Sequence, residues 1–135
     1  MKDKIFLDTN ILLYTYSSTE PIKQQKAIAL INQATAIIST QVLKEFSNVL
    51  SRKFNVGWTD IETALDELTR NFQIHTNDSN SIKKACQIAN RYQFSFYDSL
   101  IIAAALESGC SILYLFICYF CCNLITFVFK SIFQL

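Results

Sequence analysis

The stretch KIFLDTNILLY, residues 4–14, decides the fold. Its apolar run Ile5–Leu7 is typical of a short buried strand, and Asp8 stands where that strand ends. Thr9 and Asn10 suit either a turn from a strand into a helix or the cap of that helix. The stretch therefore predicts a strand that ends in a carboxylate and leads towards a helix.

Strands and helices are predicted to alternate along the rest of the chain. Further strands are predicted at Ala36–Ile38, Gln73–His75 and Ser111–Tyr114. The helical signals between them are Pro21 in a first turn, Ser39 or Thr40 as a cap, a capping box of Thr59 and Glu62, a cap cluster at residues 77–81, and an apolar helix at residues 98–107. Alternating strands and helices imply a parallel sheet covered on both faces. We therefore predict an α/β fold, a three-layer α/β/α sandwich with a central parallel sheet.

Three acidic residues stand at distinctive places in this plan. Asp8 follows the first strand, Glu45 borders the apolar stripe of the helix after the second strand, and Asp98 begins the apolar helix. Sites in open parallel sheets form beyond the C-terminal ends of the strands, so we expect the three acids to converge there. Each acid also has a structural explanation: a turn for Asp8, an ion pair with Lys44 or Arg52 for Glu45, and a helix cap for Asp98.

The three carboxylates together favour a divalent metal ion. Clustered carboxylates repel one another unless a cation joins them. Oxygen ligands that leave water molecules in place suit Mg²⁺ or Mn²⁺, which activate bound water and stabilise charge on a phosphate. We therefore interpret Asp8, Glu45 and Asp98 as catalytic and metal-binding residues, and phosphodiester hydrolysis as their chemistry.

Composition fits one folded domain in a reducing compartment. The chain has 135 residues, of which 51% are hydrophobic and 17% charged, and its net charge of +1 neither indicates nor excludes a nucleic acid partner. Asp3 and Asp8 interrupt the first apolar run, so no signal peptide is predicted and a cytoplasmic location is expected.

The five cysteines do not predict a metal site. The run Cys118, Cys121 and Cys122 has no second pair of ligands, and no histidine stands at zinc-site spacing. Cys86 and Cys110 are expected to be small core residues.

The end of the chain has a different character. Residues 115–135 carry one charge, Lys130, and no charged residue occurs from Ile112 to Phe129. That stretch is about long enough for a membrane span. The alternatives are a buried terminal strand or helix, and a tail produced by a shifted reading frame, which the abrupt loss of amphipathic patterning favours.

Three segments together resemble a known family, the PIN domain. They are FLDTNIL at residues 6–12, ISTQVLKEF at residues 38–46 and FYDSLIIAAA at residues 96–105. The nearest likeness is to the toxin nucleases of bacterial VapBC-type toxin–antitoxin pairs, and it covers roughly residues 5–114. We therefore divide the chain into a PIN-like domain at residues 1–114 and an atypical hydrophobic tail at residues 115–135.

The resemblance implies a site, an activity and partners. Asp8, Glu45 and Asp98 would be the acidic metal-site residues, with Asn10 ordering the site through its amide and Thr40 assisting from the helix start. The family implies Mg²⁺- or Mn²⁺-dependent cleavage of RNA by a metal-activated water. It also implies frequent dimers and inhibition by a cognate antitoxin protein. Contact of the tail with a membrane is a less favoured expectation.

The chain departs from the family pattern after Tyr114. The family usually has a polar segment with a fourth acid there, and this chain has Leu115–Ile117 instead. The alternative is therefore a catalytically impaired remnant that retains the fold or antitoxin binding. Three aromatic residues before Asp98, namely Phe94, Phe96 and Tyr97, are candidates for stacking on RNA bases, and core packing under the loop is the favoured role for at least Phe96. His75 is interpreted as a strand-edge residue in preference to a general base.

Overall fold

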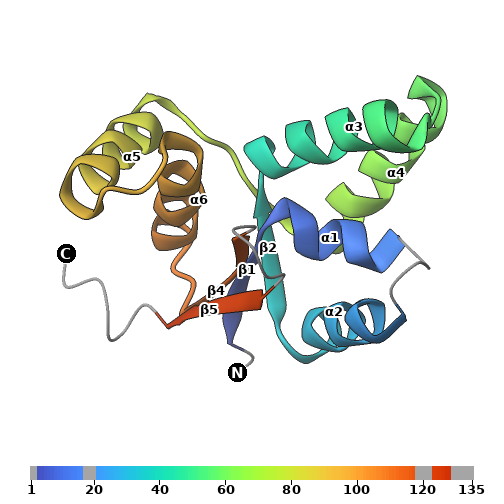
Figure 1. Ribbon diagram of the computed structural model, residues 1–135, viewed down its shortest axis with the longest axis horizontal. Coiled ribbons are helices and arrows are strands. Elements are labelled where there is room, and N and C mark those ends of the chain that lie inside the picture. Colours follow the sequence, from blue (N-terminus) through green and yellow to red (C-terminus); the bar gives the residue numbers. More distant parts are fainter. Residues whose placement is uncertain (1–2, 17–20, 118–122, 129–135) are drawn as a thin grey trace.

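The computed structural model describes residues 3–16, 21–117 and 123–128, and side chains only up to Tyr114. Figure 1 shows the course of the chain. Its elements are β1 (Lys4–Leu7), α1 (Thr9–Tyr16), α2 (Pro21–Gln33), β2 (Thr35–Ser39), α3 (Thr40–Phe54), α4 (Trp58–Asn71), β3 (Gln73–His75), α5 (Ser79–Tyr92), α6 (Phe96–Glu107), β4 (Ile112–Ile117) and β5 (Asn123–Val128).

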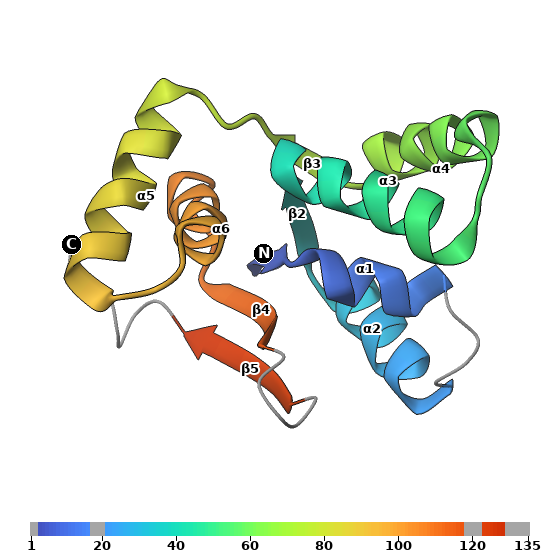
Figure 2. The same cartoon turned by 45° about the horizontal axis from the view of Figure 1, so that its top comes forward.

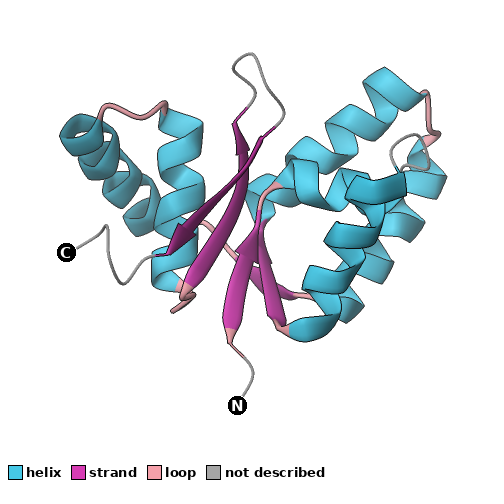
Figure 3. Cartoon of the chain, turned by 60° about the horizontal axis from the view of Figure 1, so that its bottom comes forward, coloured by secondary structure: helices cyan, strands magenta, loops and turns pink. Residues whose placement is uncertain are grey.

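The strands form one sheet in the order β3-β2-β1-β4-β5. The first four strands are parallel, with Ile5 of β1 opposite both Ala36 of β2 and Ile112 of β4. The sheet lies between two groups of helices (Figure 3), α1–α4 on one side and α5 with α6 on the other (Figure 2). The predicted three-layer α/β/α arrangement with a central parallel sheet is confirmed.

The central strands are buried because both of their faces are covered by helices. Ile5, Phe6 and Leu7 of β1 are each at most 2% exposed, and Ile38 of β2 and Leu113 of β4 are fully buried. Continuous apolar runs are what a parallel sheet covered on both faces requires. The same apolar runs therefore fix β1 in the middle of the sheet and bring its C-terminal end, with Asp8, against helix α1.

The N-terminal end of α3 follows the prediction, and that of α4 does not. The Ser39 hydroxyl caps α3 by accepting a hydrogen bond from the Val42 N–H at 3.3 Å. Helix α4 begins at Trp58 after Gly57, which supplies no side-chain cap. The predicted capping box of Thr59 and Glu62 is wrong because Thr59 already lies inside the helix, two positions after the cap residue Gly57.

The capping cluster before α5 is confirmed, but the buried face of that helix is shifted. Asp78 and Ser81 form a reciprocal capping box. The buried positions of α5 are Ser81, Ala85 and Ile88, so Cys86 lies exposed beside them. The expectation that Cys86 is a core residue is therefore wrong, whereas Cys110, at 6% exposed, is in the core as expected.

Helix α6 is the central buried helix that the sequence predicts. Ser99 and Leu100–Ala105 are buried. The helix begins at Phe96, two residues before Asp98, and Ser95 is its cap. Phe96 lies in the exposed first turn and is 40% exposed, so the prediction that it packs in the core is wrong.

The described part of the C-terminal stretch is a pair of strands. Strand β4 continues to Ile117, and β5 pairs with it in antiparallel register, with Ile112 opposite Val128. Among the described residues no helix is long and apolar enough to cross a membrane. Cys118, Cys121 and Cys122 and the end of the chain from residue 129 lie outside the described residues.

Candidate active site

Asp8 lies at the point where β1 becomes α1. Its carboxylate is 7% exposed, and its Oδ1 accepts a hydrogen bond from the Thr9 N–H at 2.7 Å. The Asp8 N–H donates to the Tyr114 carbonyl of the neighbouring strand at 3.1 Å. Its position before the first turn of α1 is favourable because the positive end of a helix dipole stabilises a carboxylate.

Thr9 connects Asp8 to Glu45. Its hydroxyl donates to Glu45 Oε2 at 2.7 Å, and its N–H is the donor to Asp8. Thr9 is 4% exposed, so both bonds are largely shielded from water. One residue therefore positions carboxylates from two elements, the end of β1 and helix α3.

Gln41 holds the second oxygen of Glu45. Its Nε2 donates to Glu45 Oε1 at 2.9 Å, one turn away on α3, and to the Tyr97 carbonyl at 3.4 Å. Gln41 is 7% exposed, and its Oε1 is buried without a hydrogen-bond partner among the described residues. Gln41 therefore links α3 to the start of α6, next to Asp98.

Asp98 follows Tyr97 in the sequence, but its carboxylate is bonded to Ser95 and not to Gln41. Its Oδ2 accepts from the Ser95 hydroxyl at 2.8 Å, and its N–H donates to the same hydroxyl at 3.2 Å. Among the described residues no three His, Cys, Asp or Glu side chains lie together closely enough to hold a metal ion. Thr9 thus links Asp8 to Glu45 by hydrogen bonds, whereas the Asp98 side chain is bonded to Ser95, the cap of helix α6.

The two supporting residues occupy different places. Asn10 lies half-buried in the first turn of α1, directly after Thr9. Thr40 is the first residue of α3, and its hydroxyl accepts from the Asn77 N–H at 3.2 Å, in the segment between β3 and α5. Both therefore lie at helix starts near strand ends, and their supporting role at the site stays a prediction.

The donor set fits Mg²⁺ or Mn²⁺. Asp8 and Glu45 offer carboxylate oxygens, and an oxygen that already accepts one hydrogen bond still has a further lone pair. Mg²⁺ keeps several of its waters and commonly uses only one or two protein carboxylates. Asp8 and Glu45 would hold the ion, whereas the carboxylate of Asp98, the third predicted ligand, is bonded to Ser95.

Sequence reasoning missed Thr9 and Gln41 as site residues. Thr9 was predicted only as a turn or cap residue, because its partner Glu45 lies 36 residues away in the chain. Gln41 had a recognisable signal, since a residue four positions before Glu45 lies next to it on a helix. His75 is the strand-edge residue that the sequence favours: it lies on β3, at the edge of the sheet, and its Nε2 is 3.0 Å from Glu107 Oε2 of α6.

Known proteins agree with this architecture. A model of the PIN domain family matches residues 5–116, which is most of the chain. The chain therefore belongs to the PIN domain family. A comparison with curated protein sequences found no match.

Several solved structures share the fold. Mycobacterium tuberculosis VapC20, a toxin that cleaves the sarcin–ricin loop, is 20% identical with a TM-score of 0.68, over 84% of this chain and 90% of that one. A toxin–antitoxin complex from Klebsiella pneumoniae is 19% identical with a TM-score of 0.65, over 95% and 92%. VapBC2 from Rickettsia felis, bound to a DNA fragment from its promoter, is 18% identical with a TM-score of 0.62, over 84% and 87%.

Proposed function

We propose that the chain is a metal-dependent endoribonuclease and the toxin of a toxin–antitoxin pair. The observation that carries the proposal is the pair of carboxylates, Asp8 and Glu45, bound by the same residue, Thr9, in a chain of the PIN domain family. The similar structures include a toxin that cleaves the sarcin–ricin loop and a toxin–antitoxin complex, which supports this class of activity and partner.

In this proposal each polar residue has a distinct task. Asp8 and Glu45 bind Mg²⁺ or Mn²⁺, and Asp98 adds the third carboxylate. Thr9 and Gln41 are positioning residues that fix both oxygens of Glu45, with Asn10 and Thr40 supporting the two helix starts. The bound ion lowers the pKa of a water molecule and offsets charge on the reacting phosphate.

Cleavage by the purified chain tests the activity. A labelled single-stranded RNA is incubated with Mg²⁺, with Mn²⁺ or with a chelator, and a DNA strand of the same sequence is the comparison. The proposal expects cleavage of the RNA with either ion and none with the chelator. Cleavage that continues in the chelator would contradict the metal-dependent mechanism.

The antitoxin partner is proposed together with a surface for it. An apolar depression of about 270 Å³ lies between α1, α3 and α4. Phe54, which is 53% exposed, lines it, and Trp58, 68% exposed, begins the adjoining helix α4. Soluble monomers rarely leave a large contiguous apolar patch uncovered, so an apolar segment of the antitoxin is the occupant that we propose.

Growth measurements test the toxin assignment and this surface. Expression of the chain alone in the cytoplasm of a bacterial host is expected to stop growth, and co-expression of the antitoxin to restore it. The change Phe54→Asp places a charge in the apolar depression and is expected to abolish this rescue without reducing RNA cleavage. Full rescue of the Phe54→Asp variant would place the antitoxin elsewhere. Dimerisation of the chain stays a prediction.

A second candidate is a non-catalytic member of the family that retains antitoxin binding. The sequence contains no acidic residue after Tyr114, where the resemblance implies a fourth acid, and Asp98 is bonded to Ser95. Turnover of RNA by the chain with Mg²⁺ or Mn²⁺ would rule this candidate out. Translation of the coding DNA after the Tyr114 codon in the other two frames would reveal whether a polar, acidic segment has been displaced.

A further inference from the structure

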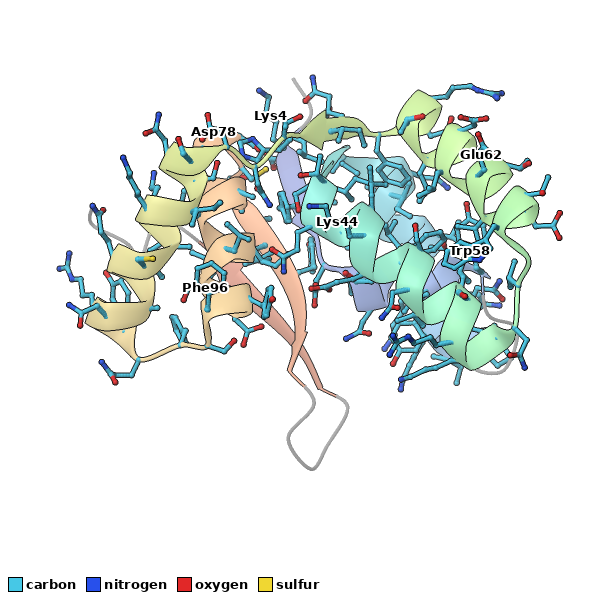
Figure 4. The ribbon with its side chains drawn as sticks, turned by 90° about the horizontal axis from the view of Figure 1, so that it is seen from above. Lys4, Lys44, Trp58, Glu62, Asp78 and Phe96 are labelled. Carbon is cyan, nitrogen blue, oxygen red and sulfur yellow. The ribbon has the colours of Figure 1, made fainter. Side chains whose placement is uncertain are left out.

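A depression with a mainly apolar lining and several polar side chains adjoins Glu45 on the side of helix α6. Its volume is about 340 Å³, and it is lined by Gln41, Lys44, Glu45 and Asn48 of α3 and by Tyr97 of α6. The two groups of helices on either side of the sheet thus contribute to one site, and Figure 4 shows Lys44 and Phe96 on the two sides. Because Glu45 is a proposed metal ligand, a molecule in this depression would lie beside the reacting phosphate.

Gln41 lines this depression and has a buried acceptor with no hydrogen-bond partner among the described residues. Its amide nitrogen has partners in Glu45 and in the Tyr97 carbonyl, but its buried Oε1 has none among the described residues. Leaving a buried acceptor without a donor costs free energy. A ligand that brings an N–H or O–H group to Gln41 Oε1 would remove that cost.

Tyr97 supplies a flat apolar surface. It is 65% exposed although it begins a largely buried helix, and its ring meets the Phe96 ring edge to face with centroids 5.5 Å apart. Its backbone is held by Gln41, so the position of the ring is tied to the metal site. Exposed aromatic rings beside a nucleic acid path stack on unpaired bases.

Lys44 and Asn48 complete the chemistry of a nucleotide site. Lys44 is exposed on α3 beside Glu45 and carries a positive charge suited to a phosphate. Asn48 lies one turn further along α3 and offers an amide that both donates and accepts. An aromatic ring, a cation and two amides in one depression match the base, phosphate and hydrogen-bonding groups of a nucleotide.

We infer that this depression binds one unpaired nucleotide of the RNA substrate next to the cleaved phosphate. Tyr97 stacks on the base, Lys44 contacts a phosphate, and Gln41 Oε1 accepts a hydrogen bond from the ribose 2′-hydroxyl or from a base N–H. The inference rests on the proposed function and deepens it, because it names the groups that select single-stranded RNA.

Binding of RNA without cleavage tests the inference. The background variant is Asp8→Asn, which removes the proposed activity, and fluorescence anisotropy reports the affinity for a labelled single-stranded RNA of mixed sequence. Tyr97→Ala is expected to weaken binding about tenfold, because stacking on one base contributes roughly that factor. Tyr97→Phe keeps the ring and is expected to bind like the parent.

The control is an exposed aromatic residue far from the site. Trp58 is 68% exposed and lies on the side of the molecule away from α6 (Figure 4), so Trp58→Ala should leave RNA affinity unchanged. Equal affinity of Tyr97→Ala and its parent would overturn the inference, as would an equal loss in Trp58→Ala. A parent that does not bind RNA at all would overturn it too.

The charge contribution has its own readout. Replacing Lys44 by Gln is expected to reduce the slope of log affinity against log salt concentration by about 1, as for loss of one phosphate contact. Lys83→Gln, an exposed change on α5, is the control that should keep the slope. If the slope is unchanged in Lys44→Gln, Lys44 does not contact a phosphate of the bound RNA.

A DNA strand of the same sequence separates the two donors for Gln41. Gln41→Met also removes the bond to the Tyr97 carbonyl, so the two strands are compared within this variant. A loss of affinity that is larger for RNA than for DNA identifies the 2′-hydroxyl as the donor, and an equal loss for both strands identifies a base N–H. An unchanged affinity for both strands would remove Gln41 from the site. The two proposals can fail separately. If Tyr97→Ala weakens RNA binding but the native chain does not cleave RNA, the nucleotide site is supported and the nuclease activity is rejected.

Discussion

Thr9 donates to two carboxylates at once: its hydroxyl lies 2.7 Å from Glu45 Oε2, and its N–H lies 2.7 Å from Asp8 Oδ1. The first bond joins α1 to α3, and the second fixes the turn after β1. Because a carboxylate that is held by donors does not have to be reoriented when a cation arrives, this arrangement would prepare both acids for the metal binding that we propose.

Thr9→Val is expected to reduce RNA cleavage roughly tenfold and to raise the Mg²⁺ concentration needed for half of the maximal rate. The substitution keeps the shape of the side chain and leaves Glu45 without one of its two donors. The free energy of unfolding should fall by about 1 kcal/mol. Titration of the cleavage rate with Mg²⁺ measures the first effect and urea denaturation the second.

Two matched variants bracket this effect. Thr9→Ser retains the hydroxyl and should preserve the metal dependence. Thr63→Val removes an exposed hydroxyl of helix α4, which donates to the Thr59 carbonyl, and should leave the metal dependence unchanged. A Thr9→Val enzyme with the Mg²⁺ dependence of the parent would show that Thr9 has no positioning role.

The stability of the chain is expected to fall in acid as Asp78 becomes protonated. The Ser81 N–H, which donates to Asp78 Oδ1 at 2.9 Å, lowers the pKa of Asp78 below its ordinary value of 3.8. A carboxyl group whose pKa is lower in the folded state than in the unfolded state stabilises the fold. This contribution is complete above the unfolded-state pKa and is lost as the pH falls through the folded-state pKa. Denaturation midpoints compared at neutral pH and at about pH 3 measure the loss.

Asp78→Asn removes this titration and keeps an amide oxygen that accepts at the helix start. The variant is expected to lose less stability than the parent between neutral pH and about pH 3. Asp66→Asn, at an exposed position of α4, is the control and should follow the parent. Identical pH profiles of the Asp78→Asn variant and the parent would contradict the role given to this cap.

Replacing Phe46 by alanine is expected to destabilise the chain more than replacing Phe54, the other phenylalanine on α3. Its side chain is fully buried and meets the Tyr16 ring edge to face at 5.3 Å, whereas Phe54 is 53% exposed. Phe46→Ala should lower the free energy of unfolding by about 3–5 kcal/mol because it leaves a cavity in the core. Phe54→Ala should cost much less, and equal losses in urea denaturation would contradict the packing described for α3.

Two cysteines should differ in their reaction with an alkylating reagent. Burial raises the pKa of the Cys110 thiol to about 11, whereas Cys86 is exposed on α5. The thiolate is the reactive form, so Cys110 should stay unmodified at neutral pH while the chain is folded. Peptide mass spectrometry after brief alkylation measures both sites, and rapid labelling of Cys110 before Cys86 would contradict the fold around β4.

The strands could be predicted because their residues are buried on both faces. Runs such as Ile5–Leu7 need no partner to be recognised, and the parallel sheet follows from their alternation with helices. Which face of a helix is buried was harder to predict. On α5, Ala85 and Ile88 are buried in the core, whereas Cys86, which follows Ala85, is exposed. Neighbouring side chains point about 100° apart around a helix, so two adjacent residues can differ in burial.

The sequence could predict that Asp8 and Glu45 lie near each other, but it could not predict the hydrogen bonds that link them. Asp8 and Glu45 are marked by their places after a strand and beside an apolar stripe. Their connection through Thr9 depends on how β1 and α3 pack, which no local pattern encodes. The rotamer of Asp98 likewise depends on a local contact, the hydrogen bond with the cap residue Ser95, which would compete with the proposed metal ion for the same carboxylate.

We propose that Asp8 binds the ion that drives RNA cleavage. Cleavage rates of the parent, Asp8→Asn and the exposed control Asp66→Asn at saturating Mg²⁺ and Mn²⁺ test this role. The rate is expected to be at least about a hundredfold lower for Asp8→Asn and unchanged for Asp66→Asn. Cleavage by Asp8→Asn at the rate of the parent would show that Asp8 does not bind the ion.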